Sequence, residues 1–227
     1  MKSHITPEMA EFYGIYIGDG NIVLNKKRRQ YRFKVSSNKN TDYEYMKRRV
    51  QFLIKKLFKK ESKIYLYKNM NYLECYFYSK KIIEFLVRLF ELDSDDVKKD
   101  RLSKKLLKND DLKKHFLRGL FDTDGTIYKK YGNYAQIGFR IYNKEIFNSV
   151  LMFLKQLGFN PSANRGFNYI YIHSQKEIER FFMEIGSANP KHIMRYIHWK
   201  KFSEVPKIDK TVQILKNFNK SLPFIDK

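Results

Sequence analysis

Apolar residues recur along this chain at two spacings, and stretches with one spacing follow stretches with the other. Between residues 28 and 36 apolar and basic side chains alternate, which predicts a strand with one buried face and one basic face. Residues 43–58 carry apolar side chains at helical intervals, and residues 64–67 and 72–78 alternate again as a hairpin. A helix that begins at Thr6-Pro7-Glu8 precedes them. The predicted order is helix, two strands, helix, two strands and a last apolar helix.

One segment of the chain occurs twice. Phe12-Tyr-Gly-Ile-Tyr-Ile-Gly-Asp-Gly20 returns as Leu117-Arg-Gly-Leu-Phe-Asp-Thr-Asp-Gly125, and the same kinds of segment follow each copy. The sequence therefore predicts an α+β fold of two pseudo-symmetric αββαββα repeats, each with an antiparallel sheet. We expect a first repeat in residues 1–100, a second in 101–205, a charged linker within 93–111 and a basic C-terminal extension in 206–227.

Both copies place small residues on one face of the predicted motif helix. Ala10, Gly14 and Gly18 recur every four residues in the first copy, as do Gly119 and Thr123 in the second. A stripe of this kind lets two helix backbones approach closely, so we expect the motif helices to pack on each other. If they run in the same direction, the aspartates that end the two copies lie side by side.

Two carboxylates in this position repel each other and oppose the helix dipole, so a cation should offset them. Hard divalent cations bind carboxylate, backbone-carbonyl and water oxygens, and they activate water for phosphodiester hydrolysis. We expect Mg²⁺, with Mn²⁺ as a substitute, at Asp19 and Asp124 together with the preceding residues Gly18 and Thr123. The alternative is that both aspartates only cap their helices ahead of glycine turns.

Composition narrows the class of partner. Lys and Arg number 46 against 24 Asp and Glu, and the resulting net charge of +22 is typical of proteins that neutralise phosphates. No apolar run reaches the roughly 18 residues of a membrane span, and the first residues lack a signal-peptide pattern. Cys75 is the only cysteine, so it makes neither an internal disulfide nor a zinc-finger cluster. We expect an intracellular protein that binds nucleic acid and no membrane.

The two repeated segments resemble the motif of the LAGLIDADG homing endonucleases. Its defining positions correspond to Gly14, Asp19 and Gly20 in the first copy and to Gly119, Asp124 and Gly125 in the second, and the resemblance extends over about 200 residues. It implies that the motif helices form the interface between the halves, and that each half lays a saddle-shaped sheet in the DNA major groove. It also implies a monomeric, two-motif chain that cuts both strands of a long, nearly asymmetric double-stranded DNA site and leaves 3′ overhangs.

Two lysines and two strand faces complete the predicted site. In this family a basic residue near the start of the last helix of each half stabilises phosphate charge or positions water, and the candidates are Lys80 and Lys176, with Lys81 fitting as well as Lys80. Arg, Gln and Asn read base edges in the major groove, whereas Lys and Ser hold phosphates. Singly, each of these residues is also compatible with an ordinary polar surface. The strand residues predicted to bind DNA are Arg28, Gln30, Arg32, Lys34, Ser36, Gln136, Arg140, Tyr142 and Asn143.

Two other functions fit the same sequence. One is a splicing cofactor, or maturase, of the same fold that binds intron RNA, and the other is a DNA-binding regulator that does not cleave. The presence of both aspartates favours cleavage over either. Asp122, whose counterpart in the first copy is Ile17, is expected to anchor its helix or contact solvent rather than to catalyse. Because the sequence has neither an initial Cys or Ser nor a terminal His-Asn pair, we expect an intron-encoded or free-standing protein rather than an intein.

Overall fold

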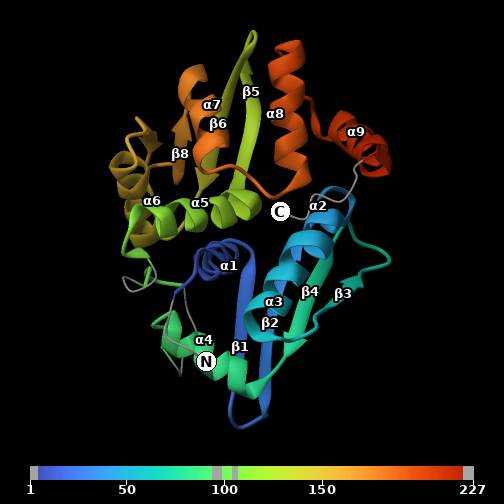
Figure 1. Ribbon diagram of the computed structural model, residues 1–227, viewed down its shortest axis with the longest axis vertical. Helices are drawn as coiled ribbons and strands as arrows, with labels where there is room; N and C mark the ends of the chain where they lie inside the picture. Colours follow the sequence, from blue (N-terminus) through green and yellow to red (C-terminus); the bar gives the residue numbers. More distant parts are fainter. Residues whose placement is uncertain (1–4, 94–98, 104–106, 222–227) are drawn as a thin grey trace.

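The computed structural model describes residues 5–93, 99–103 and 107–221. These residues fold into two halves, with helices α1 and α5 at the junction between them (Figure 1). The first half consists of α1 (Pro7–Ile17), β1 (Gly20–Asn25), β2 (Gln30–Ser37), α2 (Lys39–Tyr45), the π-helix η1 (Met46–Val50), α3 (Gln51–Phe58), β3 (Lys63–Leu66), β4 (Leu73–Tyr78) and α4 (Lys80–Leu89). The rest consists of α5 (Asp110–Asp124), β5 (Gly125–Tyr131), β6 (Tyr134–Arg140), α6 (Lys144–Gln156), β7 (Ser162–Asn164), β8 (Tyr169–Ile172), α7 (Gln175–Glu184), α8 (Pro190–Phe202) and α9 (Ile208–Ser221).

Each half contains a four-stranded antiparallel sheet with the same strand order. The orders are β1-β2-β4-β3 and β5-β6-β8-β7, so the predicted α+β fold with two αββαββα repeats is confirmed. On β2, Phe33 pairs with Ile22 on one side and with Phe77 on the other, and all three side chains are buried against the helices. Ile137 occupies the equivalent place in the second sheet. One face of each sheet therefore builds the core, because burying these apolar side chains is the main favourable contribution to folding.

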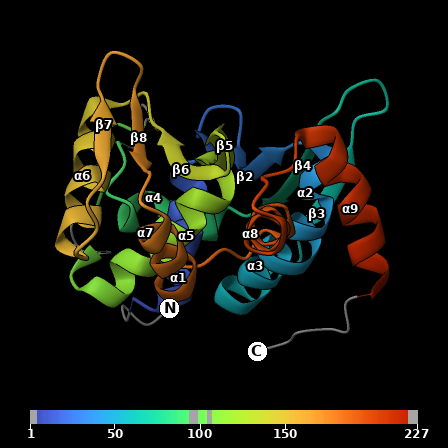
Figure 2. The same cartoon turned by 90° about the horizontal axis from the view of Figure 1, so that it is seen from above.

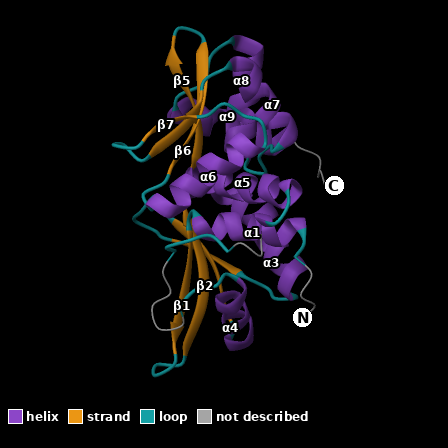
Figure 3. Cartoon of the chain, turned by 90° about the vertical axis from the view of Figure 1, so that its left-hand side faces the viewer, coloured by secondary structure: helices purple, strands orange, loops and turns teal. Residues whose placement is uncertain are grey.

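The strands gather on one side of the molecule and most of the helices on the other (Figures 2 and 3). The sheet faces that the helices leave uncovered point to the same side. The two halves thus share one broad open surface, which crosses the junction where β1 and β5 begin.

Helices α1 and α5 pack with their backbones in contact. A Cβ atom on Gly14 would overlap the backbone carbonyl oxygen of Phe116, and Gly119 meets the backbone of α1 equally closely. One turn further along, Gly18 lies against Thr123, so the two helices run in the same direction and end together. The predicted packing through the two motif helices is confirmed, and the small-residue stripe exists because no larger side chain fits there.

The helix predicted at residues 43–58 begins earlier and is not uniform. α2 starts at Lys39 because Asn38 caps it, with the Asn38 side chain accepting a hydrogen bond from Asn40 N at 2.9 Å. The π-helical turn η1 then separates α2 from α3. Apolar spacing alone did not reveal the cap, which lies outside the periodic stretch.

The chain beyond the second repeat forms α9, which packs on α8 and on α2 of the first half. Thr211 and Leu215 are buried in this contact. The predicted boundaries of the repeats and of the extension stay predictions, and residues 94–98, 104–106 and 222–227 lie outside the described residues. No described helix combines the length and the apolar character needed to cross a membrane.

Candidate active site and nucleic-acid interface

Asp19 and Asp124 meet at the shared end of the two motif helices. Asp19 follows Gly18, the C-cap of α1, and its carbonyl oxygen accepts a hydrogen bond from Ser36 N at 3.3 Å. Asp124 is the last residue of α5. A Cβ atom on Gly18 would lie 3.5 Å from the carboxyl carbon of Asp124, so the acidic ends of the helices touch. The structure thus places one carboxylate from each half where the two sheets begin.

Partial burial changes the acidity of both carboxyl groups. Burial and, next, the charge of Asp42 raise the pKa of Asp19 to about 6. Burial and the charge of Asp19 raise the pKa of Asp124 to about 7. The charged forms are therefore disfavoured, and a cation bound between them would lower both pKa values. Perturbed carboxyl pairs of this kind concentrate at functional sites.

A lysine of the linker supplies one cation to this place. Lys99 Nζ donates hydrogen bonds to Gly18 O at 2.7 Å and to Ile17 O at 3.0 Å, and it lies 5.3 Å from the ring centre of Tyr16. Burial lowers the pKa of Lys99 to about 8, while the charges of the two aspartates oppose that shift. The sequence did not single out Lys99, because it stands in a charged stretch where no spacing distinguishes one lysine from the next.

A buried acid of the first half brings a second cation close to Asp19. Lys191 Nζ lies 2.9 Å from Asp42 Oδ1, and Asn189 Nδ2 donates a hydrogen bond to the same oxygen at 2.7 Å. Although burial alone would raise it, the charge of Lys191 and the bond from Asn189 hold the pKa of Asp42 below its usual value. Asn189 Nδ2 also donates to the backbone oxygen of Asp122 at 3.0 Å, so this amide joins the two halves.

Asp122 anchors a loop of its own half. Its buried carboxylate accepts hydrogen bonds from Ala188 N at 3.0 Å and Asn189 N at 3.3 Å, and one from the Ser187 hydroxyl. Burial raises the pKa of Asp122 to about 7, against these hydrogen bonds. The group is thus an internal anchor and not a solvent contact.

Lys80 lies at the end of β2 that is far from Asp19. Lys80 is exposed at the start of α4, where its ammonium lies 5.8 Å from the ring centre of Tyr31. Tyr31 stands five residues along β2 from Ser36, which is about 16 Å at 3.3 Å per residue. Lys176 is exposed in the first turn of α7, and Lys81 is exposed beside Lys80. Their part in the reaction stays a prediction, whereas the lysines whose charge acts on Asp19 come from the linker and α8.

The open face of the first sheet carries the predicted β2 side chains, but one predicted cation is neutralised. Arg32, Lys34 and Ser36 alternate with buried residues, and Arg28 and Gln30 are exposed at the β1–β2 turn. Lys34 forms a hydrogen-bonded ion pair with an acid on β4, Glu74. Its charge is therefore already offset by an acid of the same sheet.

On the open face of the second sheet, neighbouring side chains cover more of the surface than the alternation of apolar and polar residues in β6 suggests. Gln136 lies on this face but is 3% exposed, because Tyr128 crosses over it and donates a hydrogen bond to its side-chain oxygen. Arg140 is exposed and lies 5.4 Å from the ring centre of Tyr142. Asn143 caps α6: its side-chain oxygen accepts hydrogen bonds from Glu145 N at 2.9 Å and from Ile146 N at 3.0 Å, so this oxygen is engaged. Gln136 and Arg140 line a hollow of about 370 Å³ together with aromatic residues of β5 and β8.

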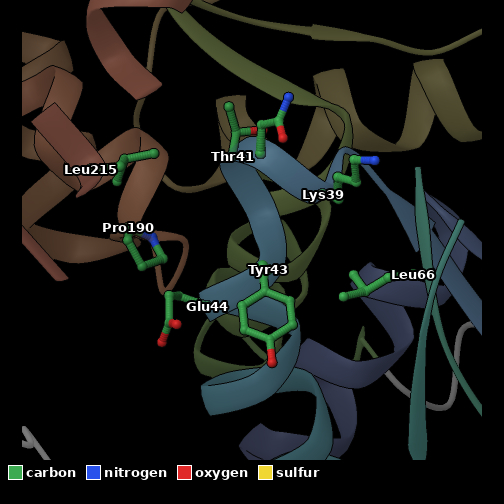
Figure 4. Close-up of a pocket in the computed structure, with 8 residues that line it drawn as sticks. Lys39, Thr41, Tyr43, Glu44, Leu66, Pro190 and Leu215 are labelled. Atoms are coloured by element: carbon green, nitrogen blue, oxygen red, sulfur yellow. The ribbon is translucent and has the colours of Figure 1, made fainter. Parts of the chain in front are cut away.

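Another hollow, of about 380 Å³, lies between α2, the end of β3, the start of α8 and α9 (Figure 4). Thr41, Leu66, Pro190 and Leu215 contribute to its walls. Neither Asp19 nor Asp124 lines it, and its mixed polar and apolar lining points to no single ligand.

A family model of the LAGLIDADG-like domain matches residues 111–186. This part of the chain is similar to a LAGLIDADG-like domain. The matched region runs through α5, with Asp124 at its end, and through the second sheet to the end of α7. The resemblance to the LAGLIDADG family that the repeated motif indicated is confirmed.

Similar proteins extend the likeness to both halves. The chain is 28% identical over 230 residues to the replication factor C small subunit of Methanocaldococcus jannaschii, a match that covers 99% of this chain and 11% of that protein's length. The homing endonuclease I-DmoI, in complex with DNA and Ca, has a TM-score of 0.57 at 20% identity over 86% of this chain and 98% of its own. Full-length DUF199/WhiA from Thermatoga maritima has a TM-score of 0.56 at 17% identity, and the match covers 96% of this chain and 68% of that protein. At these identities the structural likeness shows that the LAGLIDADG fold is shared.

Proposed function

We propose that this chain is a site-specific, metal-dependent endonuclease that hydrolyses both strands of double-stranded DNA. The observation that carries this function is the meeting of Asp19 and Asp124, one from each half, at the common end of α1 and α5. Aspartates that only capped helices would have no reason to lie together with raised pKa values, because that arrangement costs folding free energy. One carboxylate per half suits one cut per strand.

The oxygen atoms at this place fit a hard divalent cation such as Mg²⁺ or Mn²⁺. The two carboxylates and the Gly18 carbonyl are ligands of the preferred kind, and they already attract the ammonium of Lys99. The Thr123 hydroxyl donates to carbonyl oxygens of its own helix at 3.0 and 3.1 Å. Only the backbone oxygen of Thr123 is therefore left as a possible metal ligand. Among the described residues no third Asp, Glu, His or Cys completes a cluster, so water and DNA phosphate would fill the other positions. When bound, the cation would neutralise phosphate charge and activate water.

The one-sided open surface supports double-stranded DNA as the substrate. A net charge of +22 would neutralise many phosphates, and the exposed Arg28 and Arg140 and the half-buried Arg32 lie on or at the edge of this surface. The two sheets present different side chains, so each half would read a different sequence and the full target would be long and asymmetric. Because one chain supplies both halves, we propose that it acts as a monomer. Solved complexes of I-DmoI with DNA and with Mn or Ca support the same choice of partner and metal.

The test is incubation of the protein with a randomised DNA library and Mg²⁺, followed by sequencing of the cut ends. We expect double-strand breaks with 3′ overhangs at one family of related sites, binding without cleavage in Ca²⁺, and no cleavage in EDTA. Asp19→Asn and Asp124→Asn should abolish double-strand cutting with little effect on DNA binding, while Asp209→Asn, an exposed aspartate of α9, should cut normally. Full cleavage in excess EDTA, or by both active-site variants, would contradict this function.

Binding without cleavage is the second candidate. It is favoured by the likeness to DUF199/WhiA, whose N-terminal domain is a LAGLIDADG domain. A regulator would enrich one DNA site in a binding selection and leave it uncut with Mg²⁺ and Mn²⁺. A maturase would instead bind structured intron RNA more tightly than any DNA from the library.

A further inference from the structure

We propose that Lys99 is a built-in placeholder for the divalent cation: its ammonium lies beside Asp19 and Asp124 and is displaced when metal binds. The inference rests on the proposed metal site. It adds that Lys99 and the metal compete for the same oxygen atoms.

Lys99 is surrounded by groups that bind cations. Its ammonium donates to the carbonyl oxygens of Gly18 and Ile17 at 2.7 and 3.0 Å, and these oxygens end α1, where the helix dipole places partial negative charge. The face of the Tyr16 ring lies 5.3 Å away, and the charges of the two aspartates act on the same ammonium. This set of oxygens and ring face satisfies one positive charge.

The ammonium and a divalent cation compete for the same oxygen. A metal bound to the Gly18 carbonyl would lie roughly 2.0 to 2.6 Å from that oxygen, which puts it within about 5 Å of an ammonium that is 2.7 Å from the same atom. Two cations at such a separation repel strongly in a partly buried site. Metal binding therefore requires the ammonium of Lys99 to withdraw.

The side chain can withdraw without disturbing the fold around it. A lysine reaches its place through a flexible four-carbon stem, so rotation of the stem suffices to move the charge. The linker itself stays attached through Ser103, whose N donates to the Tyr13 hydroxyl at 2.8 Å and whose hydroxyl donates to Leu89 O at 3.3 Å. Lys191 differs, because its ammonium is paired with buried Asp42 at 2.9 Å.

The sign of one measurement separates a placeholder from a positioning group. If Lys99 stays beside the metal and holds the carboxylates in place, removing its charge should weaken metal binding by the protein. If Lys99 is a placeholder, removing its charge should strengthen metal binding, because a competitor is lost.

The experiment measures Mn²⁺ and Ca²⁺ binding to the whole protein by calorimetry at pH 7.5, without DNA. Lys99→Met keeps the stem and removes the charge, and Lys155→Met, an exposed lysine of α6, is the matched control. We expect Lys99→Met to bind about tenfold more tightly than wild type, and Lys155→Met to match wild type. Unchanged or weaker binding by Lys99→Met would overturn the inference.

A second measurement uses the unmodified sequence, so it does not depend on a variant that folds. Brief acetylation with and without Ca²⁺, read by mass spectrometry, should show that Ca²⁺ increases labelling of Lys99 relative to Lys155. Equal or reduced labelling would refute the placeholder. If cleavage requires metal but both measurements contradict the placeholder, only this inference is lost. If neither wild type nor either variant binds metal, the proposed metal site is contradicted as well.

Discussion

Replacing Asp124 by asparagine should abolish cleavage and also stabilise the metal-free fold at neutral pH. The pKa of Asp124 is raised from 3.8 to about 7 in the folded protein, so its ionisation opposes folding. The stability contributed by the protonated group is fully present below pH 3.8 and is lost as the pH rises through about 7. Asparagine has nearly the same shape but never carries the charge that Asp19 repels.

The size of the effect follows from the two pKa values. A shift from 3.8 to about 7 corresponds to an upper limit on the order of 4 kcal/mol. Partial exposure of the carboxyl group and its coupling to Asp19 reduce the expected gain in unfolding free energy to about 2 kcal/mol at pH 8. In a protein of this length that gain raises Tm by roughly 4 to 8 °C. Urea denaturation in EDTA at pH 4 and pH 8 measures it, with the gain nearly absent at pH 4.

Asp209→Asn serves as the control, because Asp209 is exposed on α9 and should change neither stability nor cleavage. A helix-capping Asp124 would give the opposite result, with a variant that is less stable at pH 8 and still cuts DNA. That outcome would refute the assignment of Asp124 as half of a carboxylate pair.

Three further predictions test other parts of the molecule. Arg32→Ala and Arg140→Ala should each relax discrimination in one half-site only, by about 1 to 3 kcal/mol per lost bidentate contact, and randomised-site profiling that shows the same bases affected would contradict this. Glu74→Gln should release the charge of Lys34 and so tighten binding to all DNA sequences. In anisotropy titrations the salt dependence of binding should steepen by about one counterion, and an unchanged slope would contradict this prediction. Asn189→Ala should lower the free energy of unfolding by about 2 kcal/mol in urea, because buried acceptors lose their donor, and wild-type stability would rule out the cross-half bond as a stabilising contact.

The sequence predicts best the part of the site that is repeated. Asp19 and Asp124 stand out because the same small residues precede each at the same spacing, so one copy supports the interpretation of the other. Asp42, Lys99 and Asn189 have no such second copy. Lys99 meets the end of α1, and Asn189 meets Asp42, only after segments distant in the sequence have packed together, and no local spacing encodes those contacts.

Strand alternation predicts which side chains face outward but not what they bind. Lys34 faces outward as expected, and only the pairing of β2 with β4 brings Glu74 next to it. The start of α4 at Lys80 is also where the sequence puts it. Because β4 runs antiparallel to β2, however, it ends far from Asp19 and takes Lys80 with it.

The backbone contact between α1 and α5 bears on how such a chain can diverge over generations. Since no side chain separates the helices at Gly14 and Gly119, there is no compressible layer through which a substitution in one sheet could shift the other half. If the strand faces read DNA as proposed, each would be free to drift independently toward new DNA sequences. The distance between the two aspartates, and with it the stagger between the two proposed cuts, would be inherited as a constant.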